Sequence, residues 1–180
     1  MIPNERVGSL GDALLSFVSR YPGVHVREIR RRMNLPIGTL HYHLHRLGRR
    51  GLVSLRLLGG YLCAYPERTE GDAASIPDSM RVLIALLRQP VPRSILMELY
   101  LDGPAPPAAL ARSVATSGPN LAYFLRRLEG AGLVVREGRG AERRVRLTQP
   151  GPVYESLVKF RPLPEPQADR FLQFWSELHP

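Results

Sequence analysis

Two histidines stand four residues apart, among arginines, in a segment that is predicted to be helical. At about 100° per residue, the leucines of this segment and His43 lie on one face, and the opposite face carries His41, Tyr42, His45, Arg46 and Arg49. Histidines at positions i and i+4 can share a metal ion. Arginine, histidine and tyrosine side chains on an exposed helix face can instead contact the phosphates and base edges of nucleic acid.

The surroundings of the two histidines favour contacts with nucleic acid. A metal site needs three or four ligands, but no cysteine or carboxylate cluster accompanies His41 and His45 in the sequence. We therefore expect no bound metal or cofactor. Residues 26–56 hold eight arginines and a single acid, Glu28, whereas a helix that only faces solvent usually mixes both signs of charge.

The whole chain is basic, with a formal net charge of +9 and a pI of about 10.5. Such a charge favours a polyanionic partner, with nucleic acid ranked before an anionic membrane surface. Nearly all the cations are arginines, since Lys159 is the only lysine. A GC-rich genome explains that ratio, so only the placement of the arginines is informative.

The sequence contains an internal repeat with an offset of 81 residues. LHYHLHRLGRRGLV (residues 40–53) aligns without a gap with LAYFLRRLEGAGLV (residues 121–134), and 8 of the 14 positions are identical. The equivalent of His43 is Phe124, so His43 is expected to be half-buried. Because apolar positions match throughout, the 180-residue chain is predicted to hold two small domains of the same fold.

Each copy is predicted to form three helices followed by a β-hairpin, which is the pattern of a winged helix-turn-helix. In the first copy the helices begin at Ser9, near Val26 and near Pro36, and the hairpin turns at Gly59-Gly60. In the second copy the predicted elements are helices over 95–101, 107–114 and 119–131 and a hairpin around Gly138-Arg139-Gly140. The expected fold class is mainly α with small β-hairpins (α+β).

Four segments are predicted along the chain. They are a winged helix-turn-helix domain over 1–66, a linker and apolar helix over 67–90, a second such domain over 91–150, and C-terminal helices over 151–180. The polar linker proper is expected over Glu67–Ser79. Met80–Leu87 is apolar nearly all round, which indicates burial either inside one chain or between two. Val153–Phe160 and an apolar stripe within 167–178 make the C-terminal helices a second candidate for homodimer contacts.

The segment TLHYHLHRLGRRGLV resembles the recognition helix and strand entry of the ArsR/MarR-like winged-helix regulators, most closely the tandem regulators common in archaea. The resemblance implies a transcriptional regulator that binds double-stranded DNA through the third helix of each unit, chiefly the first. It places base and phosphate contacts at Thr39, His41, Tyr42, His45 and Arg46.

Further DNA contacts are expected on both copies. In the first copy, arginines of the second helix are expected to hold phosphates, and Arg49 extends the exposed face of the third helix. The second copy has a smaller outward set, with Gly118 and Pro119 at the helix start, and its wing adds cations. The added residues are Arg27, Arg30, Arg31, Ser117, Asn120, Tyr123, Arg126, Arg127, Arg139, Arg143 and Arg144.

Other classes of protein fit the sequence less well. Paired carboxylates, a glycine-rich phosphate loop and a nucleophile beside a base are not found at meaningful spacings, so no enzymatic activity is expected. The lone Cys63 excludes an internal disulfide framework, and no signal or membrane segment is recognised, so a cytoplasmic, nucleoid-associated protein is expected. The alternative is a tandem winged-helix scaffold for protein contacts or a nonspecific chromatin protein; RNA binding is a weaker third option. The apolar first wing is expected to pack on the protein.

Overall fold

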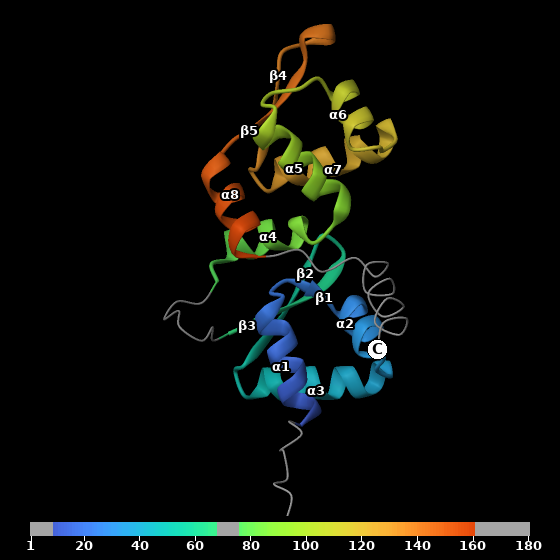
Figure 1. The fold of residues 1–180 in the computed structure, drawn as a ribbon, viewed down its shortest axis with the longest axis vertical. Helices are drawn as coiled ribbons and strands as arrows, with labels where there is room; N and C mark the ends of the chain where they lie inside the picture. Colours follow the sequence, from blue (N-terminus) through green and yellow to red (C-terminus); the bar gives the residue numbers. More distant parts are fainter. Residues whose placement is uncertain (1–8, 68–75, 161–180) are drawn as a thin grey trace, which may run out of the picture.

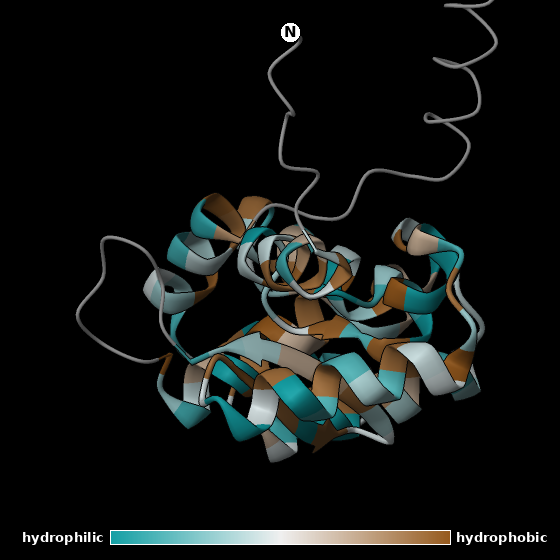
Figure 2. Cartoon of the chain, turned by 90° about the horizontal axis from the view of Figure 1, so that it is seen from below, coloured by the Kyte–Doolittle hydropathy of each residue, from teal (hydrophilic) through white to brown (hydrophobic). Residues whose placement is uncertain are grey.

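The computed structural model describes residues 9–67 and 76–160 of the chain. These residues form a mainly helical α+β fold with small antiparallel β-hairpins, which is consistent with a winged-helix architecture (Figure 1). The predicted fold class is therefore confirmed. Viewed from below (Figure 2), the helix ribbons carry both hydrophobic and hydrophilic residues, as expected for helices that bury one face.

The first half of the chain forms three helices and a three-stranded antiparallel sheet with the strand order β1-β3-β2. We refer to residues 10–66 as unit 1 and to its β2–β3 hairpin as wing 1. The elements, in chain order, are α1 (Leu10–Arg20), β1 (Val24–His25), α2 (Val26–Met33), α3 (Ile37–Arg49), β2 (Val53–Leu58) and β3 (Tyr61–Pro66).

The second half repeats this order of elements between two additional helices, α4 and α8. We refer to residues 90–147 as unit 2 and to its β4–β5 hairpin as wing 2. The elements are α4 (Asp78–Leu87), α5 (Pro90–Leu101), α6 (Pro107–Ser113), α7 (Gly118–Gly130), β4 (Val134–Glu137), the short 3-10 helix η1 (Gly140–Glu142), β5 (Arg144–Leu147) and α8 (Pro150–Lys159).

The offset of 81 residues holds in the backbone as well as in the sequence. The helices α3 and α7 cover equivalent residues, and the two hairpins pair in the same register at this offset. Val24 pairs with Ala64 in unit 1, and their equivalents Ala105 and Val145 form an isolated bridge in unit 2. The strand β1 of unit 1 is thus represented in unit 2 by a single bridge.

The helix-turn-helix bend has the same backbone geometry in both units. Asn34, at the end of α2, has a φ of 49°, as was expected of its left-handed turn, and its equivalent Ala115 also has a φ of 49°. A residue with a Cβ pays about 1–2 kcal/mol in this region. Its occurrence at an alanine indicates that the packing of α6 against α7 imposes the turn.

Each unit has its own hydrophobic core, built from the positions that the helical and strand patterns predicted. The core of unit 2 is extended by residues of α4 and by Val153 of α8. The core of unit 1 is separate and consists of Leu14, Val18, Val24, Val26, Ile29, Leu40, Leu44, Leu47, Val53 and Ala64.

The helix α4 joins the two units because its apolar residues face two sides. Leu83 and Leu86 belong to the core of unit 2, whereas Ile84 packs with Tyr65 and Cys63 of β3. The predicted burial on several sides is therefore confirmed. All residues from 83 to 87 are at most 5% exposed within one chain, so this segment is not available to pair two chains, and the expectation of a dimer through it is corrected.

The contact between β3 and α4 contains a buried tyrosine and a buried arginine. The Tyr65 hydroxyl donates a hydrogen bond of 2.6 Å to the Arg81 carbonyl, and the Arg81 guanidinium lies 5.6 Å from the centre of the Tyr65 ring. Burial raises the pKa of Tyr65 above its usual value, so the phenol stays protonated and able to donate. Glu67 and Asp78 lie 3.5 and 3.6 Å from the Arg81 guanidinium.

The tip of wing 1 lies against α4 and α7. Leu58 packs beside Ile84 and Ala85, which confirms for this residue that the apolar wing packs on the protein. Gly59 has a φ of 57°, and a Cβ at this position would overlap the guanidinium of Arg127. The prediction is wrong for Leu57, which is 72% exposed.

Two boundaries differ from those predicted. The linker was expected to reach Ser79, but α4 already begins at Asp78, directly after Pro77. The first helix of unit 2 was expected from Ile95 and begins at Pro90, because proline in a first helical turn gives up no intrahelical hydrogen bond. The apolar stripe predicted within 167–178 lies outside the described residues.

Candidate nucleic-acid interface

The helix α3 carries the predicted polar face on its solvent side, at the lower end of the molecule (Figure 1). Leu40, Leu44 and Leu47 anchor its other side and are at most 4% exposed. Thr39 is partly buried, and His43 is half-buried as predicted. The exposed predicted residues are His41, Tyr42, His45, Arg46 and Arg49.

The first turn of α3 is open to an anion. Pro36 is the N-cap residue, and no side chain caps the helix. The first N–H groups of a helix have no intrahelical acceptor, and the positive end of the helix dipole lies at the same place. A phosphate beside Ile37, which is 47% exposed, would meet both.

The end of α2 and the turn after it form a shallow basic hollow of about 770 Å³ next to this helix start. Arg27 and Arg30 are exposed there. Arg31 also lines the hollow, but its guanidinium donates to Glu28 at 2.7 and 3.1 Å. The full lining is Arg27, Arg30, Arg31, Asn34, Leu35 and Pro36.

Glu28 neutralises part of this surface. Burial alone would raise the pKa of its carboxyl group, but hydrogen bonds from Arg31 and Arg32 lower it, so Glu28 stays ionised. Within residues 9–67 and 76–160, no carboxylate forms an ion pair with the exposed arginines of the surface. We call this surface, made by Arg27, Arg30, His41, Tyr42, His45, Arg46 and Arg49, the α2–α3 basic face.

The equivalent surface of unit 2 has lost most of this charge. At the offset of 81 residues, Arg27, Arg30 and His41 correspond to Ala108, Ala111 and Ala122. Those alanines line a small apolar cavity of about 240 Å³ at the start of α7. The second copy therefore has fewer exposed cations on this surface than the first copy has.

Two polar residues predicted for unit 2 serve the start of α7. The Ser117 side chain accepts a hydrogen bond of 3.4 Å from the backbone N–H of Asn120. The Asn120 side-chain amide donates a hydrogen bond of 2.7 Å to Thr116. Tyr123 and Arg126, farther along α7, are exposed.

Arg127 does not lie on the outward face to which it was assigned. It is only partly exposed, it donates a hydrogen bond of 2.9 Å to the Gln89 side chain, and it lies over Gly59 of wing 1. The helical pattern of α7 could not reveal this contact, because Gly59, which lies against Arg127, is 68 positions earlier in the chain. We leave Arg127 out of the proposed DNA contacts.

Wing 2 carries exposed arginines at the upper end of the molecule, far from α3 (Figure 1). Arg139, Arg143 and Arg144 are exposed, and they flank the η1 turn. The structure therefore does not bring the predicted residues into one surface. One group lies on the α2–α3 basic face and the other around α7 and wing 2.

His25 is a titratable residue at the junction of the units that the sequence did not single out. Its ring stacks on Tyr61 with 4.4 Å between ring centres, and in the described part of the chain its buried Nε2 has no hydrogen-bond partner. Burial lowers the pKa of His25; Glu28 opposes this shift, and Arg88 and Arg127 add to it.

This pKa shift predicts acid sensitivity. A lowered folded-state pKa means that the unfolded chain binds the proton more tightly, so the contribution to stability is complete above about pH 6.5 and is lost as the pH falls below that value. Chemical unfolding measured at about pH 7.5 and 5.5 should show a smaller pH dependence for His25→Gln than for the wild type. The exposed His45→Gln serves as the control, and equal pH dependence in all three proteins contradicts the assignment.

The described residues lack the features of a metal site or a membrane span, and their cysteine is unreactive. No three histidine, cysteine or acidic side chains in these ranges are grouped to hold a metal ion. No helix there is long and apolar enough to cross a membrane. Burial raises the pKa of the Cys63 thiol to about 12, which makes it a poor nucleophile.

No protein-family model matches the chain. Over 127 residues the chain is 27% identical to a protein of Methanocaldococcus jannaschii that is named an uncharacterized HTH-type transcriptional regulator. The match covers 71% of this chain but only 30% of the relative. The chain is therefore similar to part of an HTH-type transcriptional regulator.

Proposed function

We propose that the chain is a transcriptional regulator that binds double-stranded DNA through the α2–α3 basic face. The main supporting observation is that one surface combines an uncapped helix start, exposed arginines that no described carboxylate neutralises, and an exposed tyrosine. Such a helix fits the major groove, where arginine donates to guanine and phosphates are contacted by neighbouring cations. The similarity to a regulator supports this function.

The proposal assigns different roles to the two halves of the chain. Units 1 and 2 are taken as separate winged-helix domains, over 1–66 and 91–150, of a tandem regulator that associates with the chromosome. Unit 1 supplies the major-groove contacts. Unit 2 contributes wing 2, whose arginines can reach a phosphate or a minor groove, and otherwise serves as a platform that covers wing 1.

Fluorescence anisotropy with a labelled duplex of mixed sequence tests the proposal. If the face neutralises about four phosphates, the logarithm of the binding constant should fall with the logarithm of the salt concentration with a slope of about −3.6. A single-stranded RNA of equal length should bind more weakly, because Tyr61 is the one exposed aromatic ring on a strand among the described residues, whereas single-strand platforms stack several bases on a sheet. Absence of duplex binding at low salt, or tighter binding of the RNA, contradicts the proposed function.

A protein-interaction role is the second candidate, and one observation favours it. The helices α5 and α8 share an exposed apolar surface on which the rings of Tyr100 and Tyr154 stack with 5.6 Å between centres. A second copy of the chain pairing through α8 would cover it, in line with the predicted C-terminal dimer contacts. Light scattering tests this: a dimer that becomes a monomer in Val158→Asp supports it, and a monomeric wild type rejects it. The exposed members are Met97, Tyr100, Leu101, Tyr154 and Val158.

A further inference from the structure

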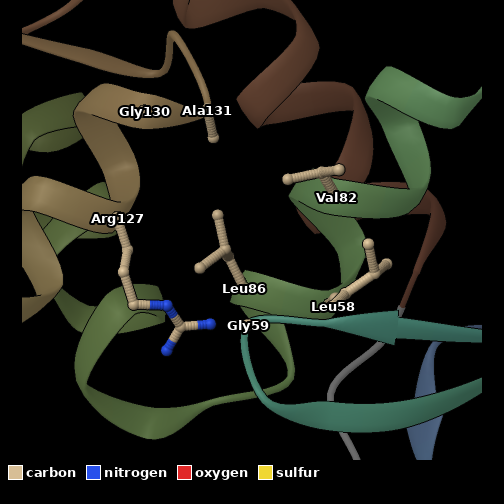
Figure 3. A pocket seen from close by; sticks show the side chains of 8 residues that line it. Leu58, Gly59, Val82, Leu86, Arg127, Gly130 and Ala131 are labelled. Atoms are coloured by element: carbon tan, nitrogen blue, oxygen red, sulfur yellow. The ribbon is translucent and has the colours of Figure 1, made fainter.

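A small cavity lies where wing 1 meets unit 2 (Figure 3). Its volume is about 250 Å³. Three elements far apart in the sequence contribute to it: the tip of wing 1, one side of α4, and the end of α7. The lining consists of Leu58, Gly59, Val82, Ala85, Leu86, Arg127, Gly130 and Ala131.

The walls are aliphatic apart from one guanidinium. Leu86 and Val82 project into the space from α4, and Arg127 enters it from α7 (Figure 3). No acidic residue lines the cavity. An apolar pocket with one well-placed charged group selects a ligand that has an apolar body and the opposite charge.

The guanidinium of Arg127 is held in place from one side. Its Nη1 donates to the Oε1 atom of Gln89; the amide of Gln89 is itself buried and donates to the Ala85 carbonyl. The rings of Tyr123 and Phe124 lie 5.5 and 5.7 Å from the guanidinium carbon.

These contacts are polar or aromatic, and none is with a carboxylate among the described residues. A partly buried cation without a counter-charge is costly. A carboxylate ligand would compensate this charge, with the geometry that guanidinium groups favour.

Comparison with unit 1 shows why space exists at this position. Unit 1 has Arg49 and Arg50 at the positions that are Gly130 and Ala131 in unit 2. A Cβ added at Gly130 would have no atom within 4 Å. Two arginine side chains of unit 1 are thus replaced by glycine and alanine in unit 2. The neighbouring arginine is present in both units, as Arg46 and as Arg127.

We propose that this cavity binds a small monocarboxylate with a compact branched-aliphatic or aromatic tail. The carboxylate would pair with Arg127, and the tail would pack against Leu86, Val82 and Leu58. The site is independent of DNA binding, so it stands or falls separately from the proposed function.

The test uses the full chain without DNA and two matched pairs of probes: 4-methylpentanoate with its amide, and phenylacetate with its amide. We expect at least one carboxylate to raise the melting temperature and to bind in calorimetry, and its uncharged amide to bind at least about ten-fold more weakly, as loss of a charged hydrogen bond implies. Arg127→Met should abolish this preference for the acid. Arg112→Met, an exposed arginine of α6, should retain it.

A second variant separates loss of the site from loss of the fold. Val82→Phe keeps the charge of Arg127 but fills the cavity, and it should lose the ligand while its circular dichroism spectrum is unchanged. The proposal is overturned if neither carboxylate binds at a concentration of about 10 mM, which is well above the dissociation constants of typical ligands. It is equally overturned if Arg127→Met binds the acids as tightly as the wild type does.

Discussion

Replacing Tyr65 with alanine is expected to lower the free energy of unfolding by about 3–5 kcal/mol, the range for removing a fully buried aromatic side chain. Tyr65 is a residue of β3; its side chain is 0% exposed and packs against Ile84 and Ala85 of α4. The substitution leaves a cavity at the joint between the units and also removes the hydrogen bond to the Arg81 carbonyl. Denaturant unfolding followed by circular dichroism measures the loss.

Two further variants divide the contribution of Tyr65 into parts. Tyr65→Phe keeps the packing and removes only the hydrogen bond, so it should cost about 1 kcal/mol. Tyr154→Ala removes the same kind of side chain from a position that is 52% exposed, and surface substitutions usually stay within about 0.5 kcal/mol. A loss in Tyr65→Ala no larger than that in Tyr154→Ala would show that the joint does not hold the units together.

The charge reversal Arg46→Glu is expected to weaken duplex DNA binding by about 1–3 kcal/mol, roughly five-fold to more than one hundred-fold, because it removes a contact and adds repulsion. Arg46 lies on the exposed side of α3, in the last turn of the helix. Tyr42→Ala, one helical turn earlier, should have an effect in the same range if base edges are contacted. Anisotropy titrations at a single salt concentration give the affinities.

The matched control is Arg20→Glu, which changes the net charge of the chain by the same amount. Arg20 is exposed at the end of α1, away from the α2–α3 basic face. Arg20→Glu should weaken binding by less than about three-fold, since only long-range electrostatics are altered. Equal losses in the two variants would indicate that net charge, and not the face of α3, determines binding.

The repeated elements were predictable because they depend on local patterns. The apolar positions of α3, the stop at Gly51 and the turn at Asn34 are all visible in the sequence, and the 81-residue offset doubles each signal. The start of α5 was missed because the prolines at 90 and 92 were not taken as first-turn residues. The strand β1 is only two residues long, too short for any alternation of apolar and polar residues.

The contacts between the units were not predictable from either copy alone. Arg126 and Arg127 are neighbours in the sequence of α7. Nothing in that sequence shows that Gly59 of wing 1 covers Arg127 and leaves Arg126 exposed. Likewise, the apolar wing predicted packing without naming its partner, which is α4. Such contacts arise between residues distant in sequence, and they determine which of the predicted DNA-binding residues stay exposed to solvent.

Amide hydrogen–deuterium exchange with and without a duplex tests the central claim most directly, since it locates the bound surface on the intact chain. We expect DNA to slow exchange in α2 and α3 and to leave wing 1 and α4 unaffected. A smaller protection at wing 2 is compatible with its exposed arginines. Protection confined to α6, α7 and wing 2, with none in residues 26–45, would contradict the claim that unit 1 binds DNA.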